Sequence, residues 1–111
     1  MSAFATLKTN KDFRTLYYRG KSVIHPAVVT YVRKNRLGTP RVGITVGKKI
    51  GNAVKRNRCR RVIREAYRQI AGNVQGGWDI VLVARTRLLR MKSTELEPIL
   101  QAHLKQCGVL K

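Results

Sequence analysis

The sequence predicts a single domain of the α+β class, and three observations lead to this prediction. Its 111 residues suffice for one compact core and leave no room for a second. Short apolar segments recur along the chain, some with the period of a strand and others with the period of a helix. Turn residues separate these segments throughout, with no internal repeat, low-complexity tract or long linker. Residues 1–111 are therefore expected to form one domain.

Three segments combine helical periodicity with residues that begin and end helices. The first follows the capping residues 9–12 and stops at Gly20, the second runs from Gly51-Asn52 to about Ile70 and is closed by Gly72, and the third is capped by Ser93 or Thr94. Their apolar faces are Phe13, Leu16 and Tyr17 in the first, Cys59, Val62, Ile63, Ala66 and Ile70 in the second, and Leu96, Ile99, Leu100, Leu104 and Cys107 in the third. We expect the face of the third helix to be buried.

Three other segments predict strands. Residues 27–34 are rich in β-branched side chains, and residues 41–46 alternate strictly between apolar and other side chains. Residues 78–85 contain a nearly continuous apolar run, which is typical of a central strand. The intervening residues 35–40 carry Asn, Gly and Pro, so they predict a turn that joins the first two strands as an antiparallel hairpin.

The charge of the chain indicates a polyanionic partner. Lys and Arg total 24 against 5 Asp and Glu, which gives a net charge of +19. A compact fold concentrates the resulting repulsion, and a nucleic acid or an anionic membrane would relieve it. The chain has no run of about 20 apolar residues, and residues 1–7 lack the apolar region of a signal peptide. We therefore expect a cytoplasmic protein that binds nucleic acid and no membrane.

The densest charge lies on the second predicted helix and just before it. The basic residues there are Lys48, Lys49, Lys55, Arg56, Arg58, Arg60, Arg61, Arg64 and Arg68, opposed only by Glu65. A helical wheel places Arg56, Asn57, Arg60, Arg61, Arg64 and Arg68 on one arc, away from the apolar face. A solvated surface helix usually mixes both signs, and a membrane-surface helix usually carries Trp, Phe or Leu on its apolar face. Arginine pairs well with phosphate, so an RNA or DNA backbone is the favoured target.

Aromatic side chains give a second, weaker indication. Phe13 and Tyr17 lie at helical spacing and Tyr31 lies on a strand, so the three could converge near basic residues and stack bases of a single strand. From spacing alone Phe13 fits the core, whereas Tyr17 and Tyr31 fit the core or the surface equally well.

The remaining reactive side chains do not suggest a catalytic site. Cys59 and Cys107 are far apart in the sequence and both fall on apolar helix faces, so we expect two reduced core thiols and no zinc site. The acidic residues show no metal-ligand pattern, and His25 and His103 stand alone in different elements. We assign no catalytic residue and no metal ligand.

The sequence of residues 51–65, GNAVKRNRCRRVIRE, closely resembles the Arg-Asn-Arg signature of the bacterial ribonuclease P protein family. The similarity extends, in the order of the family, to Lys11-Asp12-Phe13 with Arg19-Gly20, to Arg41–Ile44 with Lys48-Lys49, and to Asp79–Arg85. Two departures are Gly47, where a Ser is frequent, and His25-Pro26, which replaces a more polar, Arg-containing stretch.

The resemblance implies an accessory subunit of an enzyme whose catalytic part is RNA. That complex removes the 5′ leader of precursor tRNA by magnesium-assisted hydrolysis of a phosphodiester bond, with Mg²⁺ bound mainly by the RNA. The partners would be the catalytic RNA and precursor tRNA, with no obligate protein partner. The implied fold is a small α/β sandwich with three helices, a four-stranded sheet and a left-handed βαβ crossover. The fourth strand would be a short segment near Lys48-Lys49 or a break in one of the three strands above.

The same resemblance assigns the site residues. The implied contacts to the catalytic RNA are Lys48, Lys49, Asn52, Lys55, Arg56, Asn57, Arg58, Arg60, Arg61, Arg64 and Arg68. The implied leader-binding residues, in a cleft between the first helix and the sheet, are Phe13, Tyr17 and Tyr31. Two alternatives stay open on composition alone. A ribosomal protein would share the size and charge, and a protein-only nuclease would need the acid and base groups that the sequence lacks.

Overall fold

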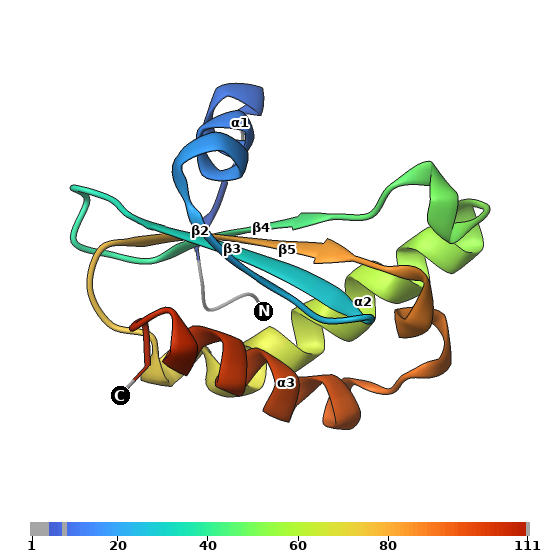
Figure 1. Cartoon of the computed structure of the whole chain (residues 1–111). Helices are drawn as coiled ribbons and strands as arrows, with labels where there is room; N and C mark the ends of the chain where they lie inside the picture. The colour runs from blue at the N-terminus through green and yellow to red at the C-terminus, as the bar shows by residue number, and fades with distance from the viewer. Residues whose placement is uncertain (1–4, 8, 111) are drawn as a thin grey trace.

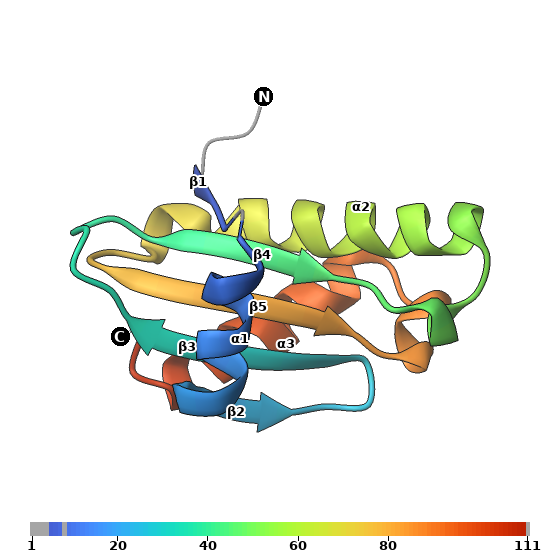
Figure 2. The same cartoon turned by 90° about the horizontal axis from the view of Figure 1, so that it is seen from above.

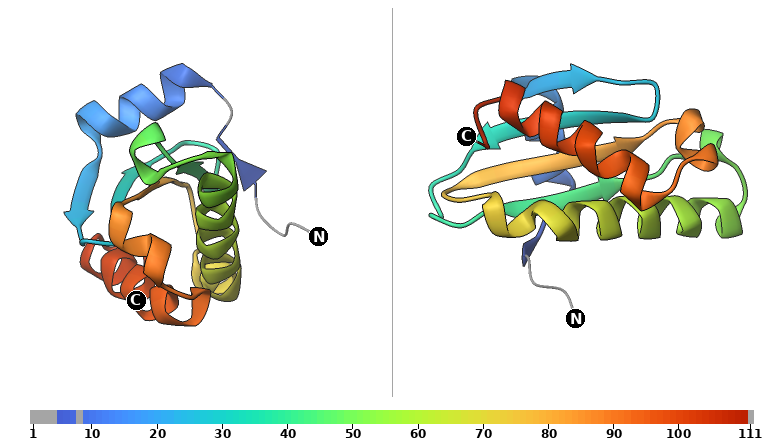
Figure 3. Two further views of the ribbon diagram at one scale, coloured as in Figure 1. Left: turned by 90° about the vertical axis from the view of Figure 1, so that its right-hand side faces the viewer. Right: turned by 90° about the horizontal axis from the view of Figure 1, so that it is seen from below.

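The computed structural model describes residues 5–7 and 9–110 and has one mixed sheet between two layers of helix (Figure 1). The elements are β1 (Ala5–Thr6), α1 (Asn10–Arg19), β2 (Lys21–Ile24), β3 (Val28–Lys34), β4 (Arg41–Thr45), η1 (Lys48–Ile50), α2 (Ala53–Ile70), η2 (Ala71–Asn73), β5 (Trp78–Ala84), η3 (Thr86–Arg90) and α3 (Ser93–Gln106). Helix α1 covers one face of the sheet, and α2 and α3 cover the other side by side (Figure 3). The α+β class and the three helices are confirmed. The expectation that residues 1–7 form no signal peptide falls largely on residues 1–4, which lie outside the described residues.

The predicted hairpin between residues 27–34 and 41–46 is wrong. The strand order is β1-β4-β5-β3-β2, so β5 lies between β3 and β4, antiparallel to the first and parallel to the second. The reason is that β5 is buried on both faces, so the backbone N–H and C=O groups along both of its edges need neighbouring strands as partners. The intervening turn therefore passes over the end of β5, where the backbone N–H of Asn35 donates a hydrogen bond of 2.8 Å to the Gly77 carbonyl oxygen. The approach is close, since a Cβ on Gly77 would lie 2.5 Å from Asn35 Oδ1.

Two strands were not predicted, and the suggested fourth strand near Lys48-Lys49 is wrong because those residues begin the 3-10 helix η1. The hairpin partner of β3 is β2, an edge strand with a mostly exposed Lys-Ser-Val-Ile sequence. The two-residue β1 pairs in parallel with β4, so the sheet has five strands and not the four that the resemblance implied. Neither strand has the apolar alternation by which strands are recognised in a sequence.

The connection from β4 through α2 to β5 is a left-handed crossover, as the resemblance implied. Figure 2 looks onto the α1 face of the sheet, with β4 and β5 both pointing to the right. The chain leaves β4, returns through α2 on the far face and enters β5, which lies below β4 in this view. Most such connections in proteins are right-handed, so this is an exception to a strong rule.

The two faces of the sheet carry two separate apolar clusters. The larger lies between the sheet and α2 and α3, and it includes the predicted helix residues Cys59, Ile63, Ala66, Ile70, Leu96, Leu100, Leu104 and Cys107, with Val62 and Ile99 partly buried at its margin. The smaller lies under α1 and consists of Leu7, Leu16 and Val81, with Phe13, Tyr31 and Val83 packed against it. Both cysteines are free and buried, as predicted. Burial raises the pKa of each thiol, so both are protonated at neutral pH.

Side-chain caps fix the starts of the helices. Thr9 accepts from the Asp12 amide at 3.1 Å and Asn52 accepts from the Lys55 amide at 3.0 Å, as the sequence predicted for α1 and α2. The predicted cap of α3 by Ser93 or Thr94 is wrong. The Glu95 carboxylate instead accepts from the Lys92 amide at 3.0 Å, which satisfies an amide that has no partner within the helix.

Gly43 allows the Phe13 ring to lie directly on the sheet, because a Cβ on Gly43 would be 2.6 Å from two of its ring carbons. We expect Gly43→Ala to displace the ring and lower the free energy of unfolding by about 1–3 kcal/mol. Urea unfolding measures the difference, with Gly72→Ala as the matched control because a Cβ on Gly72 meets no atom within 4 Å. Equal stability of the two variants would contradict this account of the packing.

His103 is buried in α3 and shares a hydrogen bond of 2.7 Å between its Nδ1 and Thr30 Oγ1 on β3. Burial, and the charge of His25 to a smaller extent, lower the pKa of His103 below its usual value of about 6.5. The unfolded chain therefore binds more protons in the window below about pH 6.5, and the free energy of unfolding should fall as the pH drops through the lowered pKa. Denaturation at a series of pH values should show a shallower decline for His103→Gln; an unchanged slope would exclude His103 as its source.

Candidate nucleic-acid interface

A cleft of about 670 Å³ lies between α1 and the nearest strand residues. Its lining is Asn10, Phe13, Arg14, Tyr17, Ile44, Thr45, Val46 and Arg60. The first four follow one another at helical spacing along α1, and Arg60 reaches the cleft from α2 on the other side of the sheet edge. The cleft therefore joins an aromatic stripe on α1 to the arginine-rich helix.

The three aromatic residues assigned to the leader lie together. The Tyr17 and Tyr31 rings meet edge to face with centroids 5.0 Å apart, and the Tyr17 hydroxyl shares a hydrogen bond of 3.1 Å with Thr45 Oγ1. Tyr17 is 38% exposed, whereas Phe13 and Tyr31 are half-buried against the small apolar cluster. Phe13 packs on the sheet, as its spacing predicted, and it also lines the cleft.

The assigned cations of α2 differ in how free they are. Lys48, Lys49, Lys55, Arg61 and Arg64 are exposed, while Arg56 and Arg60 are half-buried. Arg60 donates to Asn57 Oδ1 at 3.1 Å, which orients its guanidinium along the helix surface. Arg68 is held by Glu65 at 2.7 Å, and this hydrogen bond lowers the pKa of the Glu65 carboxyl. Arg61 and Arg64 therefore present the less compensated charge.

Two other assigned residues are engaged within the protein. The Asn52 side chain caps α2, so its oxygen is occupied. Arg58 donates to the carbonyl oxygens of Leu89 and Met91, at 3.3 and 3.1 Å. The helical wheel had placed Arg58 outside the arginine-rich arc, and only the family resemblance assigned to it a contact with the catalytic RNA.

A further basic segment was missed in the sequence. Arg85, Arg87, Arg90 and Lys92 are all exposed on and beside η3, which packs against η1 and α2. Four cations within eight residues, without an acidic residue, could have identified it. The segment broadens the basic surface around the start of α2, and the hydrogen bonds of Arg58 tie it there.

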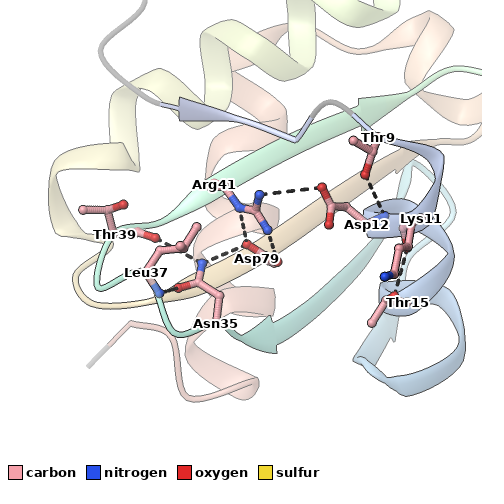
Figure 4. Close-up of polar contacts among 9 residues, drawn as sticks. All are labelled: Thr9, Lys11, Asp12, Thr15, Asn35, Leu37, Thr39, Arg41 and Asp79. Atoms are coloured by element: carbon pink, nitrogen blue, oxygen red, sulfur yellow. Dashed lines mark hydrogen bonds and ion pairs between the residues drawn. The ribbon is translucent and has the colours of Figure 1, made fainter.

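Arg41, at the base of α1, forms ion pairs with two of the five acidic residues (Figure 4). Its guanidinium donates to both Asp79 carboxylate oxygens, at 2.9 and 2.8 Å, and lies 3.6 Å from Asp12 Oδ2. The hydrogen bonds to Asp79 raise the pKa of Arg41. Asn35 also donates to Asp79 Oδ1 at 2.8 Å, so this network fastens the long turn, β4, β5 and α1 together.

Among residues 5–7 and 9–110, no three His, Cys, Asp or Glu side chains gather where they could hold a metal ion. Within the same residues, no helix is long and apolar enough to cross a membrane.

Comparison with known proteins adds independent findings. A family model described as Ribonuclease P matches residues 1–108. The chain is 45% identical over 87 residues to the ribonuclease P protein component of Natranaerobius thermophilus, which covers 78% of this chain and 76% of that protein. It is 38% identical over 104 residues to the corresponding protein of Clostridium botulinum strain Langeland, covering 93% of this chain and 94% of the relative.

Solved structures agree with the fold. The Staphylococcus aureus RNase P protein superimposes with a TM-score of 0.84 and 33% identity, covering 99% of this chain and 100% of that one. The Thermotoga maritima RNase P protein gives a TM-score of 0.78 and 30% identity, covering 96% and 97%. Since the family model spans nearly the whole chain and relatives align over almost all of it, the chain belongs to the ribonuclease P protein family.

Proposed function

We propose that this chain is the protein subunit of a ribonuclease P, which binds the catalytic RNA and the 5′ leader of precursor tRNA and so promotes removal of the leader. The observation that carries the proposal is the cleft in which Phe13 and Tyr17 lie next to Arg60. Aromatic rings within a basic groove are the usual platform for a single strand, and the arginine face suits a phosphate backbone. Family membership favours this function over that of a ribosomal protein.

In this proposal the protein acts as an accessory subunit and the chemistry stays with the RNA. We expect Mg²⁺ to be bound mainly by the RNA subunit, whose phosphate oxygens are ligands that this ion prefers. The protein residues orient the substrate: the rings hold unpaired bases of the leader, and the cations hold the backbones of both RNAs. The partners are therefore the catalytic RNA and precursor tRNA.

Binding of the catalytic RNA is tested by removing the uncompensated charge of α2. We expect the double variant Arg61→Ala/Arg64→Ala to bind the catalytic RNA more weakly, with a salt dependence that is shallower by about 1 per lost phosphate contact. Arg68→Ala is the control, because Glu65 already compensates Arg68 in the free protein. Filter binding at several salt concentrations measures both quantities; a double variant whose affinity and slope match those of the wild type would refute this RNA-binding face.

Leader recognition is tested at Tyr17, where the ring and the hydroxyl can be separated. In the complex reconstituted with a transcribed catalytic RNA, Tyr17→Ala should weaken binding of precursor tRNA by about 1–3 kcal/mol and leave mature tRNA unaffected, since one stacked base is lost. Tyr17→Phe keeps the ring and loses only the hydrogen bond to Thr45, so it should bind nearly as the wild type does. If Tyr17→Ala weakened mature tRNA equally, the cleft would not be a leader site.

A further inference from the structure

A second hollow lies along α1 beside the cleft. It has a volume of about 460 Å³ and is lined by Lys11, Arg14, Thr15, Tyr18, Arg19 and Arg33; we call it the outer groove. The outer-groove residues of α1 follow the cleft residues by one position along the helix, so the two stripes lie side by side on its surface. Arg14 belongs to both linings, so the two hollows meet at this residue.

The outer groove carries uncompensated positive charge. Asp12 and Asp79 are the acidic residues of the neighbouring hollow, and both contact Arg41. Among the described residues no salt bridge engages Lys11, Arg14, Arg19 or Arg33. Four cations around one hollow therefore lack an anionic partner within the described part of the protein, which favours binding of a polyanion.

Tyr18 indicates which kind of polyanion fits. Its side chain is 85% exposed, and it belongs to neither apolar cluster of the described residues. An exposed ring beside cations offers a base a surface for stacking, whereas a free phosphate or a double-stranded backbone would make no use of the ring. The lining thus matches a single strand of RNA.

We propose that the outer groove binds the nucleotides of the leader that extend beyond the cleft, with Tyr18 stacking a base and Lys11, Arg14, Arg19 and Arg33 holding phosphates. This inference rests on the proposed function, because it continues the strand held at Tyr17. The shared Arg14 provides the continuity: a strand leaving the cleft meets Arg14 and then Tyr18. The outer groove follows the cleft along the path of the strand, so only leaders that extend beyond the cleft reach it.

The proposal is tested with precursor tRNAs that differ only in leader length. In the reconstituted complex, Tyr18→Ala should weaken binding of the long-leader substrate about tenfold, the loss expected for one stacked base, and leave the short-leader substrate unchanged. Tyr18→Phe keeps the ring and should restore the affinity for the long leader. Because Tyr18 is largely exposed, neither variant should alter the fold, and circular dichroism and urea unfolding verify this.

The outcomes separate this proposal from the leader cleft itself. Tyr17→Ala should weaken the binding of every leader that reaches the cleft. If Tyr17→Ala weakened the binding of neither substrate, the cleft would be refuted as a leader site, whereas the outer groove is tested separately by Tyr18→Ala. A Tyr18→Ala variant that binds the long leader like the wild type, or that loses as much with the short leader, would overturn the outer groove as a leader site. The proposed occupant would also be wrong if Tyr18→Ala weakened binding of a single-stranded RNA oligonucleotide to the free protein but left binding of the long-leader precursor tRNA unchanged.

Discussion

The central strand β5 is covered on both faces, and this burial determines where the RNA-facing elements lie. Ile80 and Leu82 pack toward α2 and α3, whereas Val81 packs toward α1. Because the strand is shielded from water, the backbone groups along both of its edges need strand partners, and this separates β3 from β4 and sends the chain across the end of β5. The same arrangement leaves α1 alone on its face, so that hollows form along its flanks. On the opposite face, α2 lies close enough to the sheet edge for Arg60 to enter the cleft.

Most of the acidic residues make contacts that stabilise the fold. Asp12 and Asp79 contact Arg41, Glu65 contacts Arg68, and Glu95 accepts from the amide that precedes α3. Each of these contacts stabilises a junction or a helix, and together they use four of the five acidic side chains. Most cations of the cleft, of α2 and of the outer groove consequently have no salt-bridge partner among the described residues. The net charge of +19 therefore lies mainly on surfaces outside these structural contacts.

Local sequence signals predicted the helices well, because the caps at Thr9 and Asn52 and the apolar faces act within a few residues. The same signals predicted β5 as a central strand from its continuous apolar run. They failed for strand pairing: residues 35–40 contain hairpin turn residues, yet the pairing of β3 with β5 depends on burial that spans distant parts of the chain. They also missed β2, whose edge position requires no apolar alternation. For the site, spacing alone could not decide whether Tyr17 and Tyr31 are buried, since their edge-to-face contact joins a helix to a strand fourteen residues away in the sequence.

Arg58 shows how a residue of an RNA-binding signature can serve the RNA indirectly. By donating to two carbonyl oxygens of the segment after β5, it holds the cations of residues 85–92 beside α2 before any RNA is bound. Ordering a flexible basic loop at the moment of binding would cost conformational entropy, and that cost would be subtracted from the affinity. Here the ordering happens during folding. The fold itself therefore preorganises two basic segments, far apart in the sequence, as one surface.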